Sequence, residues 1–277
     1  MSVIAQAGAK GRQLHKFGGS SLADAKCYLR VAGIMKEYSQ AGDMMVVSAA
    51  GSTTNQLISW LKLSQSDRLA AHQVQQSLRR YHTELIGGLV EPAAADTLIA
   101  AFIHDLERLA GLLDGGVSEA VYAEVVGHGE VWSARLMAAV LNQLGMEAAW
   151  LDARAFLRAE RAAQPQVDEG LSYPLLQQLM AQHPNKRLVV TGFISRNQAG
   201  ETVLLGRNGS DYSATQIGAL AGASRVTIWS DVAGVYSADP RKVKDACLLP
   251  LLRLDEASEL ARLAAPVLHA RTLQPVS

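Results

Sequence analysis

The sequence has little of several features that mark common protein classes. It holds only two cysteines, Cys27 and Cys247, so it cannot build a disulfide framework, and we expect both thiols to be reduced. No apolar run is long enough to span a bilayer, and the opening residues lack the apolar core of a signal peptide. These absences predict a cytoplasmic protein with no membrane partner.

An excess of charge of either sign is also missing. Lys and Arg together number 26, as do Asp and Glu, so the formal net charge is zero. The basic residues are scattered, and no basic tract is longer than a pair such as Arg79-Arg80. Nucleic-acid binding usually requires a basic cluster. We therefore expect no nucleic-acid partner.

Several catalytic signatures are absent as well. The chain has no P-loop of the form G-x-x-x-x-G-K-S/T, no protein-kinase HRD or DFG, and no G-x-S-x-G elbow of a serine hydrolase. It has no G-x-G-x-x-G for a dinucleotide and no closely spaced His/Cys group for zinc. The sequence itself therefore indicates no metal-ligating residues.

What is present is an alternation of strand-like and helix-like segments. Apolar runs predict strands at 11–17, 43–50, 147–152, 187–193 and 225–231, and helical spacing predicts helices at 22–35, 56–114, 118–144, 210–221 and 255–272. The polar segment 158–172 is predicted to be a surface loop or hairpin. This order indicates an α/β fold with a mainly parallel sheet and a helical insertion.

Polar turns follow four of the predicted strands, after the segments 16–17, 46–50, 189–193 and 227–231. In parallel sheets, ligands bind beyond the carboxyl ends of the strands. We expect these turns to converge on one crevice.

The first of these turns combines Lys16, Gly18, Gly19 and Ser20. Glycines allow close approach to a ligand, free amides at a helix start bind anions, and lysine adds a point charge for a phosphoryl group. The order is wrong for a P-loop, in which lysine follows the glycines. A plain glycine turn with a solvated lysine explains the residues equally well.

Two further segments offer groups for an amino-acid ligand. Thr54 follows a buried strand, where a helix cap is the more ordinary interpretation and a bond to a substrate carboxylate the alternative. Glu130 follows the helix-breaking glycines of G-H-G-E; it is either a surface acid or a partner for a substrate ammonium, and the pattern favours the second. His128 is more simply explained as structural.

The remaining segments lie towards the carboxyl terminus. L-G-R-N-G-S-D (205–211) places Arg207, a fork-shaped carboxylate donor, before Ser210 and Asp211 at a predicted helix start. S-D-V-A-G-V-Y-S-A-D-P-R (230–241) offers Tyr236 for a base and Arg241 for phosphates, or is a plain surface loop. Taken together, the cations at strand ends suggest a phosphorylated ligand.

The five motifs K-F-G-G-S-S, S-A-A-G-S-T-T-N, G-H-G-E, L-G-R-N-G-S-D-Y-S-A and S-D-V-A-G-V-Y-S-A-D-P-R occur in the order seen in aspartokinases. The resemblance covers about residues 13–272. Within the family, the chain most resembles the kinase part of bifunctional aspartokinase–homoserine dehydrogenases of the methionine-linked type. It implies the amino-acid kinase fold, an αβα sandwich around a mainly parallel sheet. It also implies transfer of the ATP γ-phosphoryl group to the side-chain carboxylate of L-aspartate, with Mg²⁺.

The resemblance assigns roles to residues of this chain. Lys16 and Asp211 would be catalytic, and Thr54, Glu130, Arg207 and Ser210 would bind aspartate, with Glu130 taking its ammonium and Arg207 a carboxylate. The nucleotide would be bound by the following set: Lys16, Gly18, Gly19, Ser20, Ser230, Asp231, Tyr236 and Arg241. An acceptor carboxylate is ionised at neutral pH, so no general base is required.

Three departures from the family pattern stand out. Ser20-Ser21 replaces Thr-Ser and keeps both hydroxyls, and Trp229-Ser230 replaces a common Thr-Thr, which puts adenine-side contacts in question. Pro266 stands where the family commonly has a lysine that reaches the phosphates. Either ATP binding is weakened, or another cation such as Lys242 or Lys244 substitutes.

The resemblance also implies an organisation. We expect a flexible N-terminus (1–12), a catalytic domain (13–272) with an aspartate lobe (13–195) and a nucleotide lobe (196–272), and the start of a linker (273–277). Regulatory and dehydrogenase domains are absent, and a dimer and a fused homoserine dehydrogenase in the parent protein are expected. The alternatives are a kinase for another small acceptor and a weakly active scaffold.

Overall fold

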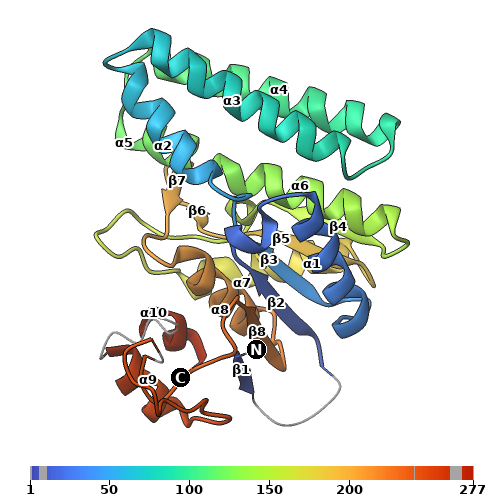
Figure 1. The fold of residues 1–277 in the computed structure, drawn as a ribbon, viewed down its shortest axis with the longest axis vertical. Coiled ribbons are helices and arrows are strands. Elements are labelled where there is room, and N and C mark those ends of the chain that lie inside the picture. The colour runs from blue at the N-terminus through green and yellow to red at the C-terminus, as the bar shows by residue number, and fades with distance from the viewer. Residues whose placement is uncertain (1, 6–10, 240, 263–269, 277) are drawn as a thin grey trace.

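The computed structural model describes residues 2–5, 11–239, 241–262 and 270–276. Six strands form the central sheet in the order β1-β8-β2-β3-β5-β4 (Figure 1). They are β1 (Ser2–Ala5), β2 (Gln13–Phe17), β3 (Met44–Val47), β4 (Ala148–Leu151), β5 (Arg187–Thr191) and β8 (Arg225–Trp229). All neighbours pair in parallel except β1, which is antiparallel to β8. The predicted α/β fold with a mainly parallel sheet is confirmed.

Both faces of the sheet are covered by helices, because its central strands are apolar on both sides. Along β3, Met45 and Val47 pack into one core and Met44 and Val46 into the other. The helices of the first layer are α1 (Ala25–Tyr38) and α6 (His128–Gln143), and those of the second are α7 (Glu169–Gln182) and α8 (Gly209–Leu220). The fold is therefore an αβα sandwich.

A group of helices extends the first layer away from the sheet (Figure 1). It consists of α2 (Thr53–Ser64), α3 (Arg68–Gly87), α4 (Pro92–Asp114) and α5 (Glu119–Val126). Within the run predicted as helical at 56–114, α3 ends at Gly87 and α4 begins at Pro92. A second break falls at 65–67, where the Asp67 carboxylate accepts a hydrogen bond from the Ala70 amide at 3.0 Å. The predicted helical insertion is present.

The C-terminal third adds two smaller parts. A hairpin of β6 (Ile194–Arg196) and β7 (Thr202–Leu204) precedes α8. Helices α9 (Leu254–Arg262) and α10 (Ala270–Leu273) lie at the lower end of Figure 1, beyond α8. Each overlaps the segment 255–272, for which the sequence predicts a helical tail, and extends one residue beyond it. Pro266 lies outside the described residues.

Three details differ from the sequence-based expectation. The loop predicted at 158–172 ends at Asp168, whose carboxylate caps α7 by accepting from the Leu171 amide at 2.9 Å. Pro174 lies inside α7 and hides the helical pattern in the sequence. Leu144, predicted on a buried face, is 46% exposed because it follows the last turn of α6. Strand β1 was not predicted.

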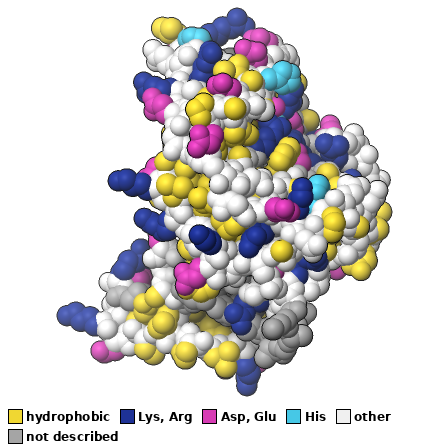
Figure 2. Space-filling view, turned by 90° about the vertical axis from the view of Figure 1, so that its right-hand side faces the viewer, with side chains coloured by type: hydrophobic (Ala, Val, Ile, Leu, Met, Phe, Trp, Pro, Cys, Tyr) yellow, Lys and Arg dark blue, Asp and Glu magenta, His cyan; other side chains and the backbone are white. Residues whose placement is uncertain are grey.

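The surface agrees with the balanced composition. Basic and acidic side chains are interspersed over the face drawn in Figure 2. Within the described part of the chain, every helix is too short or too polar to cross a bilayer. Cys27 and Cys247 are both free thiols.

Candidate active site at the carboxyl ends of the strands

The turns after β2, β3 and β5 are joined by hydrogen bonds between their backbones. The Ser48 amide donates to the Phe17 carbonyl at 3.1 Å, and the Gly51 amide donates to the Gly19 carbonyl at 3.0 Å. The Gly192 amide donates to the Val47 carbonyl at 2.9 Å. The predicted convergence is therefore present for the turns after β2, β3 and β5, and it follows from the parallel order of these strands.

Lys16 and Asp211 form an ion pair across this edge of the sheet. Lys16 ends β2 with its side chain 10% exposed, and Asp211 lies in the first turn of α8. A carboxylate is favoured there by the partial positive charge of the helix N-terminus. The pairing keeps an ammonium group fixed at the place where a glycine turn meets a helix start.

Gly19 has no room for a side chain. A Cβ on this residue would lie 2.8 Å from the Ala49 carbonyl oxygen and 3.1 Å from that of Gly51. Gly18 lies beside the lysine, because its Cβ would stand 3.5 Å from Lys16 Nζ. The next residue, Ser20, is exposed. The two glycines thus allow the turn to pass between the lysine and the β3 turn.

The turn after β5 contacts the start of α8. A Cβ on Gly192 would lie 2.9 Å from the Ser210 hydroxyl oxygen. Its neighbour Phe193 has a φ of 67°, an unusual conformation for a non-glycine residue, and its amide donates to the Ser213 hydroxyl at 2.8 Å. The sequence predicts only a turn at this place. A glycine directly after a buried strand was the signal for the close approach of this turn to Ser210.

Glu130 lies in the first turn of α6 and is 3% exposed, so the alternative of a surface acid is wrong. Burial raises the pKa of its carboxyl to about 8, although hydrogen bonds with the backbone of Ala49 and with its own amide act in the opposite direction. Its Oε2 is buried without a hydrogen-bond partner among the described residues. A buried oxygen in that state is suited to a donor brought by a ligand.

Thr54 is the second residue of α2 and is half-buried. The preceding Thr53 is fully buried, and its hydroxyl lies 3.1 Å from Nε2 of His82 on α3. Burial lowers the pKa of His82 to about 3, so this histidine is neutral. The Thr53–His82 contact could not be predicted from a local pattern, because 29 residues separate the pair.

Arg207 belongs to the loop between β7 and α8 and is exposed. Gly206 and Asn208 flank it, both in the left-handed conformation with φ of 79° and 55°. No ion pair of Arg207 occurs with the described residues. Its guanidinium is thus available to a ligand carboxylate.

The predicted nucleotide stretch lies after β8 and is largely exposed. The Ser230 hydroxyl donates to the Asp231 carboxylate at 3.2 Å, and the exposed Arg241 guanidinium donates to Asp239 at 3.0 and 3.1 Å. Tyr236 is half-buried and pairs with Leu248 in an isolated β-bridge. None of these contacts joins the stretch to Lys16.

Trp229 faces away from the Lys16 side of the sheet. Its indole stacks on Phe17 with centroids 5.9 Å apart, and its Nε1 donates to His15 Nδ1 at 3.2 Å. Along β2, Phe17 and Lys16 point to opposite faces. The tryptophan that departs from the family pattern is therefore part of the core under α1.

The comparisons with known proteins agree with this geometry. A model described as the amino acid kinase family matches residues 11–277. The chain is 87% identical over its whole length to bifunctional aspartokinase/homoserine dehydrogenase 2 of Escherichia coli strain K12, of which it covers 34%. It is 32% identical over 94% of its length to lysine-sensitive aspartokinase 3 of the same organism, covering 58% of that protein.

Among solved structures, E. coli aspartokinase III in complex with aspartate and ADP matches with a TM-score of 0.85 at 30% identity. The match covers 96% of this chain and 59% of that one. The chain thus spans from about a third to about three fifths of the length of these relatives. On its sequence and its fold, the chain belongs to the amino acid kinase family.

Proposed function

We propose that this chain is an aspartate kinase, which transfers the γ-phosphoryl group of ATP to the side-chain carboxylate of L-aspartate. The observation that carries the proposal is the buried Glu130 with its unpartnered oxygen, close to the edge where Lys16 and Asp211 pair. A buried acid suits an amino-acid acceptor, because the ammonium of the acceptor supplies the missing donor and charge. Similarity to aspartokinases supports the same assignment.

On the acceptor side, Glu130 takes the ammonium of aspartate and Arg207 its α-carboxylate, while Thr54 and Ser210 contribute hydroxyls. In the reaction, an oxygen of the side-chain carboxylate forms a bond to the γ-phosphorus. The bond from that phosphorus to the β–γ bridging oxygen breaks, and its electron pair leaves with ADP. The attacking group is already ionised at neutral pH, so no residue has to remove a proton from it.

On the phosphate side, Lys16 and the amides of Gly18 and Gly19 hold the transferring group. Phosphoryl transfer depends mainly on positioning and charge stabilisation, and Lys16 is preorganised for both by its pairing with Asp211. Ser20, Ser230, Asp231, Tyr236 and Arg241 complete the proposed nucleotide site.

Magnesium is the metal that such a reaction requires. Among the described residues there is no group of three His, Cys, Asp or Glu side chains that could hold a metal by itself. Mg²⁺ is usually bound by one or two carboxylates together with substrate phosphates, and Asp211 is a carboxylate at the right edge of the sheet. When bound, the ion would neutralise charge on the phosphates.

The wider organisation is part of the same proposal. We assign residues 13–195 to the acceptor lobe and 196–272 to the nucleotide lobe. A dimeric assembly, a fusion to homoserine dehydrogenase and a cytoplasmic location accompany the assignment, on the basis of the resemblance to the bifunctional enzymes.

The experiment that tests the function is ADP release from Mg-ATP with L-aspartate, N-acetylglutamate or UMP as the acceptor. We expect turnover with aspartate alone. Turnover with another acceptor and none with aspartate would replace the proposed substrate. A folded chain that releases no ADP with any acceptor would instead indicate a scaffold domain.

A further inference from the structure

The bend between α5 and α6, residues 126–128, lies between the start of α2, which carries Thr54, and the β6–β7 hairpin, which precedes Arg207. On one side of the bend, Gly129 packs closely against the turn after β3. A Cβ on Gly129 would lie 2.7 Å from the Ala49 Cβ and 3.0 Å from Thr53 Cγ2. The bend is thereby fixed relative to the start of α2, which carries Thr54.

On its other side the bend contacts the β6–β7 hairpin. A Cβ on Gly127 would collide with Ile194 Cγ2 of β6 and would lie 3.2 Å from Leu204 Cδ2 of β7. Arg207 stands in the loop that follows β7. The two glycines of G-H-G-E thus serve two different contacts, and each allows an approach that no other residue permits.

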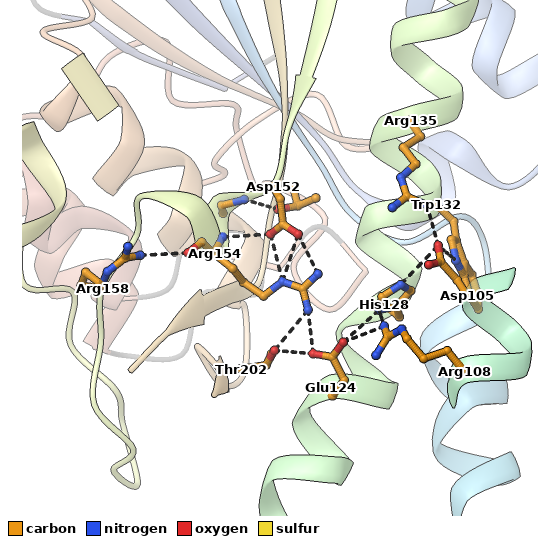
Figure 3. Close-up of polar contacts among 12 residues, drawn as sticks. Asp105, Arg108, Glu124, His128, Trp132, Arg135, Asp152, Arg154, Arg158 and Thr202 are labelled. Atoms are coloured by element: carbon orange, nitrogen blue, oxygen red, sulfur yellow. Dashed lines mark hydrogen bonds and ion pairs between the residues drawn. The ribbon is translucent and has the colours of Figure 1, made fainter. Parts of the chain in front are cut away.

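A polar network reinforces the contact with the hairpin (Figure 3). Glu124, one turn before the bend, accepts hydrogen bonds at Oε2 from the Thr202 hydroxyl at 2.5 Å and from Arg154 Nη1 at 2.7 Å. Its Oε1 accepts from Arg108 Nη2 at 2.8 Å. A single carboxylate therefore connects α5 to β7, to the turn after β4 and to α4.

Arg154 is the second member of this connection. Its guanidinium donates to Thr202 Oγ1 at 3.2 Å and binds both oxygens of Asp152, with Nη2 2.6 Å from Oδ2. Burial acts to raise the pKa of Glu124, but Arg154, Thr202 and Arg108 outweigh it and lower that pKa to about 2. Glu124 is thus ionised at neutral pH.

The network continues on the far side of the bend. His128 is 2% exposed, with Nδ1 3.6 Å from Glu124 Oε1 and Nε2 3.4 Å from Asp105 Oδ2. Asp105 also accepts from Arg135 Nη1 at 2.5 Å. The three carboxylates are balanced by three guanidiniums, those of Arg108, Arg135 and Arg154. The ordinary role of His128 that the sequence suggested is consistent with this buried setting.

We propose that Glu124, Arg154 and Thr202 act as positioning residues that hold Glu130 and Arg207 at the separation that the ammonium and α-carboxylate of the acceptor require. The inference rests on the proposed function, because it assigns the ammonium to Glu130 and the α-carboxylate to Arg207. Glu130 begins α6 directly after the bend, and Arg207 follows the hairpin held by Thr202. Loosening the Glu124–Thr202 contact lets the two groups move apart.

The test uses Thr202→Val, which keeps the shape of the side chain and removes its hydroxyl, and Thr202→Ser, which restores the hydroxyl. We expect Thr202→Val to raise KM for aspartate about tenfold, as loss of a hydrogen bond to a charged group predicts, while KM for ATP stays within about twofold. Selectivity for aspartate over glutamate should stay unchanged, because the two acceptors share the same ammonium and α-carboxylate. Thr202→Ser should return KM for aspartate to near that of the wild type.

Glu201→Gln is the matched control. Glu201 lies in the same hairpin, and its carboxylate pairs with Arg161 at 3.1 Å and not with a residue of α5. We expect it to leave both KM values unchanged. Glu124→Gln, which removes the charge from the centre of the network, should repeat the effect of Thr202→Val.

Aspartate binding measured by calorimetry separates this inference from the proposed function. A wild-type chain that binds and phosphorylates aspartate, together with a Thr202→Val variant of unchanged KM for aspartate, overturns the inference and leaves the function intact. Equal losses for aspartate and ATP would mean that the network only stabilises the fold, and would also overturn it. A wild-type chain that neither binds nor phosphorylates aspartate overturns both.

Discussion

The two halves of the candidate site are built in different ways. At the acceptor and the transferring phosphoryl group, the contacts join residues far apart in the chain, such as Glu124 with Thr202 and Lys16 with Asp211, and the side chains are mostly buried. On the nucleotide side, Ser230 bonds the adjacent Asp231, and Arg241 bonds Asp239 two residues away. These side chains are largely exposed.

The difference has a physical consequence. Long-range buried contacts fix groups before a ligand arrives, so little free energy is spent on ordering them. Short-range exposed contacts leave a segment to be organised by its ligand. We therefore expect the acceptor side to be preorganised and the stretch 230–241 to be shaped by the bound nucleotide.

The strongest test of the preorganised half is Lys16→Ala. Because Lys16 is the cation placed for the transferring group, we expect kcat to fall about 10³-fold, the loss typical for removal of a preorganised charge or donor. The measurement is ADP release with aspartate and Mg-ATP. An unchanged rate and unchanged ATP affinity would show that the mechanism is wrong.

Lys16→Ala also leaves the half-buried Asp211 carboxylate without its partner, which should destabilise the fold by less than the ~3–5 kcal/mol expected for a fully buried pair. The double variant Lys16→Ala/Asp211→Asn removes that charge, and it should recover thermal stability without recovering activity. Lys62→Ala, on the exposed face of α2, is the control for loss of a lysine and should behave as the wild type.

The second largest effect is expected for Glu130→Gln. Glutamine keeps the size of the side chain but cannot neutralise an ammonium, so KM for aspartate should rise about 100-fold, as for loss of a buried charged partner, with KM for ATP little changed. The comparison of the two KM values is the measurement. Equal increases in both would contradict the assignment of Glu130 to the acceptor.

The raised pKa of Glu130 gives a prediction about pH. Between the ordinary carboxyl pKa and the folded value of about 8, the folded chain holds a proton that the unfolded chain has released. Stability of the ligand-free chain should therefore fall as pH rises through this window. Thermal unfolding of the wild type and Glu130→Gln at several pH values should show this decrease as a difference between the two chains, because groups such as His82 contribute equally to both.

Binding of aspartate should reverse the protonation of Glu130, because an ammonium favours the ionised carboxyl. At neutral pH, we expect binding to release a proton. Calorimetry in buffers of different ionisation enthalpy measures this release directly. Absence of proton release in the wild type would place the ammonium elsewhere.

A smaller effect is expected at the bend. Gly127 has an ordinary helical φ of −77°, so Gly127→Ala is opposed by crowding and not by backbone strain. Its Cβ would collide with Ile194 and lie 3.0 Å from the Ala123 carbonyl oxygen and 3.2 Å from Leu204 Cδ2, at a cost of about 1–3 kcal/mol for overpacking. Thermal unfolding measures the loss, and KM for aspartate should rise with it. Gly33→Ala, in α1 with no atom near its Cβ, is the control and should stabilise by about 0.5–1 kcal/mol.

The sequence predicts the parts of the site that are local in the chain. The glycine turn with Lys16, the helix start at Ser210 and Asp211, and the convergence of turns at the strand carboxyl ends follow from short patterns and from the rule for parallel sheets. Five motifs in family order carried the assignment of Thr54, Glu130 and Arg207.

What the sequence could not predict depends on contacts between distant segments. The Glu124–Thr202 bond spans 78 residues, and nothing in either local pattern marks the pair. The burial of Glu130 is likewise a tertiary effect, because an acid after a helix break is equally compatible with a surface position. The helix α7 was missed for a local reason, since Pro174 interrupts its pattern.

The smallest effects should come from the nucleotide half, and they test whether Arg241 leaves Asp239 for the phosphates. Asp239→Asn frees the guanidinium, so it should lower KM for ATP, whereas Arg241→Ala should raise it, each by less than about fivefold because exposed charges are screened. Neither variant should change KM for aspartate or thermal stability, and both effects should shrink at high ionic strength. If Asp239→Asn and Arg241→Ala instead change KM for ATP in the same direction, the ion pair itself shapes the loop, and the nucleotide half is more preorganised than its short-range contacts indicate.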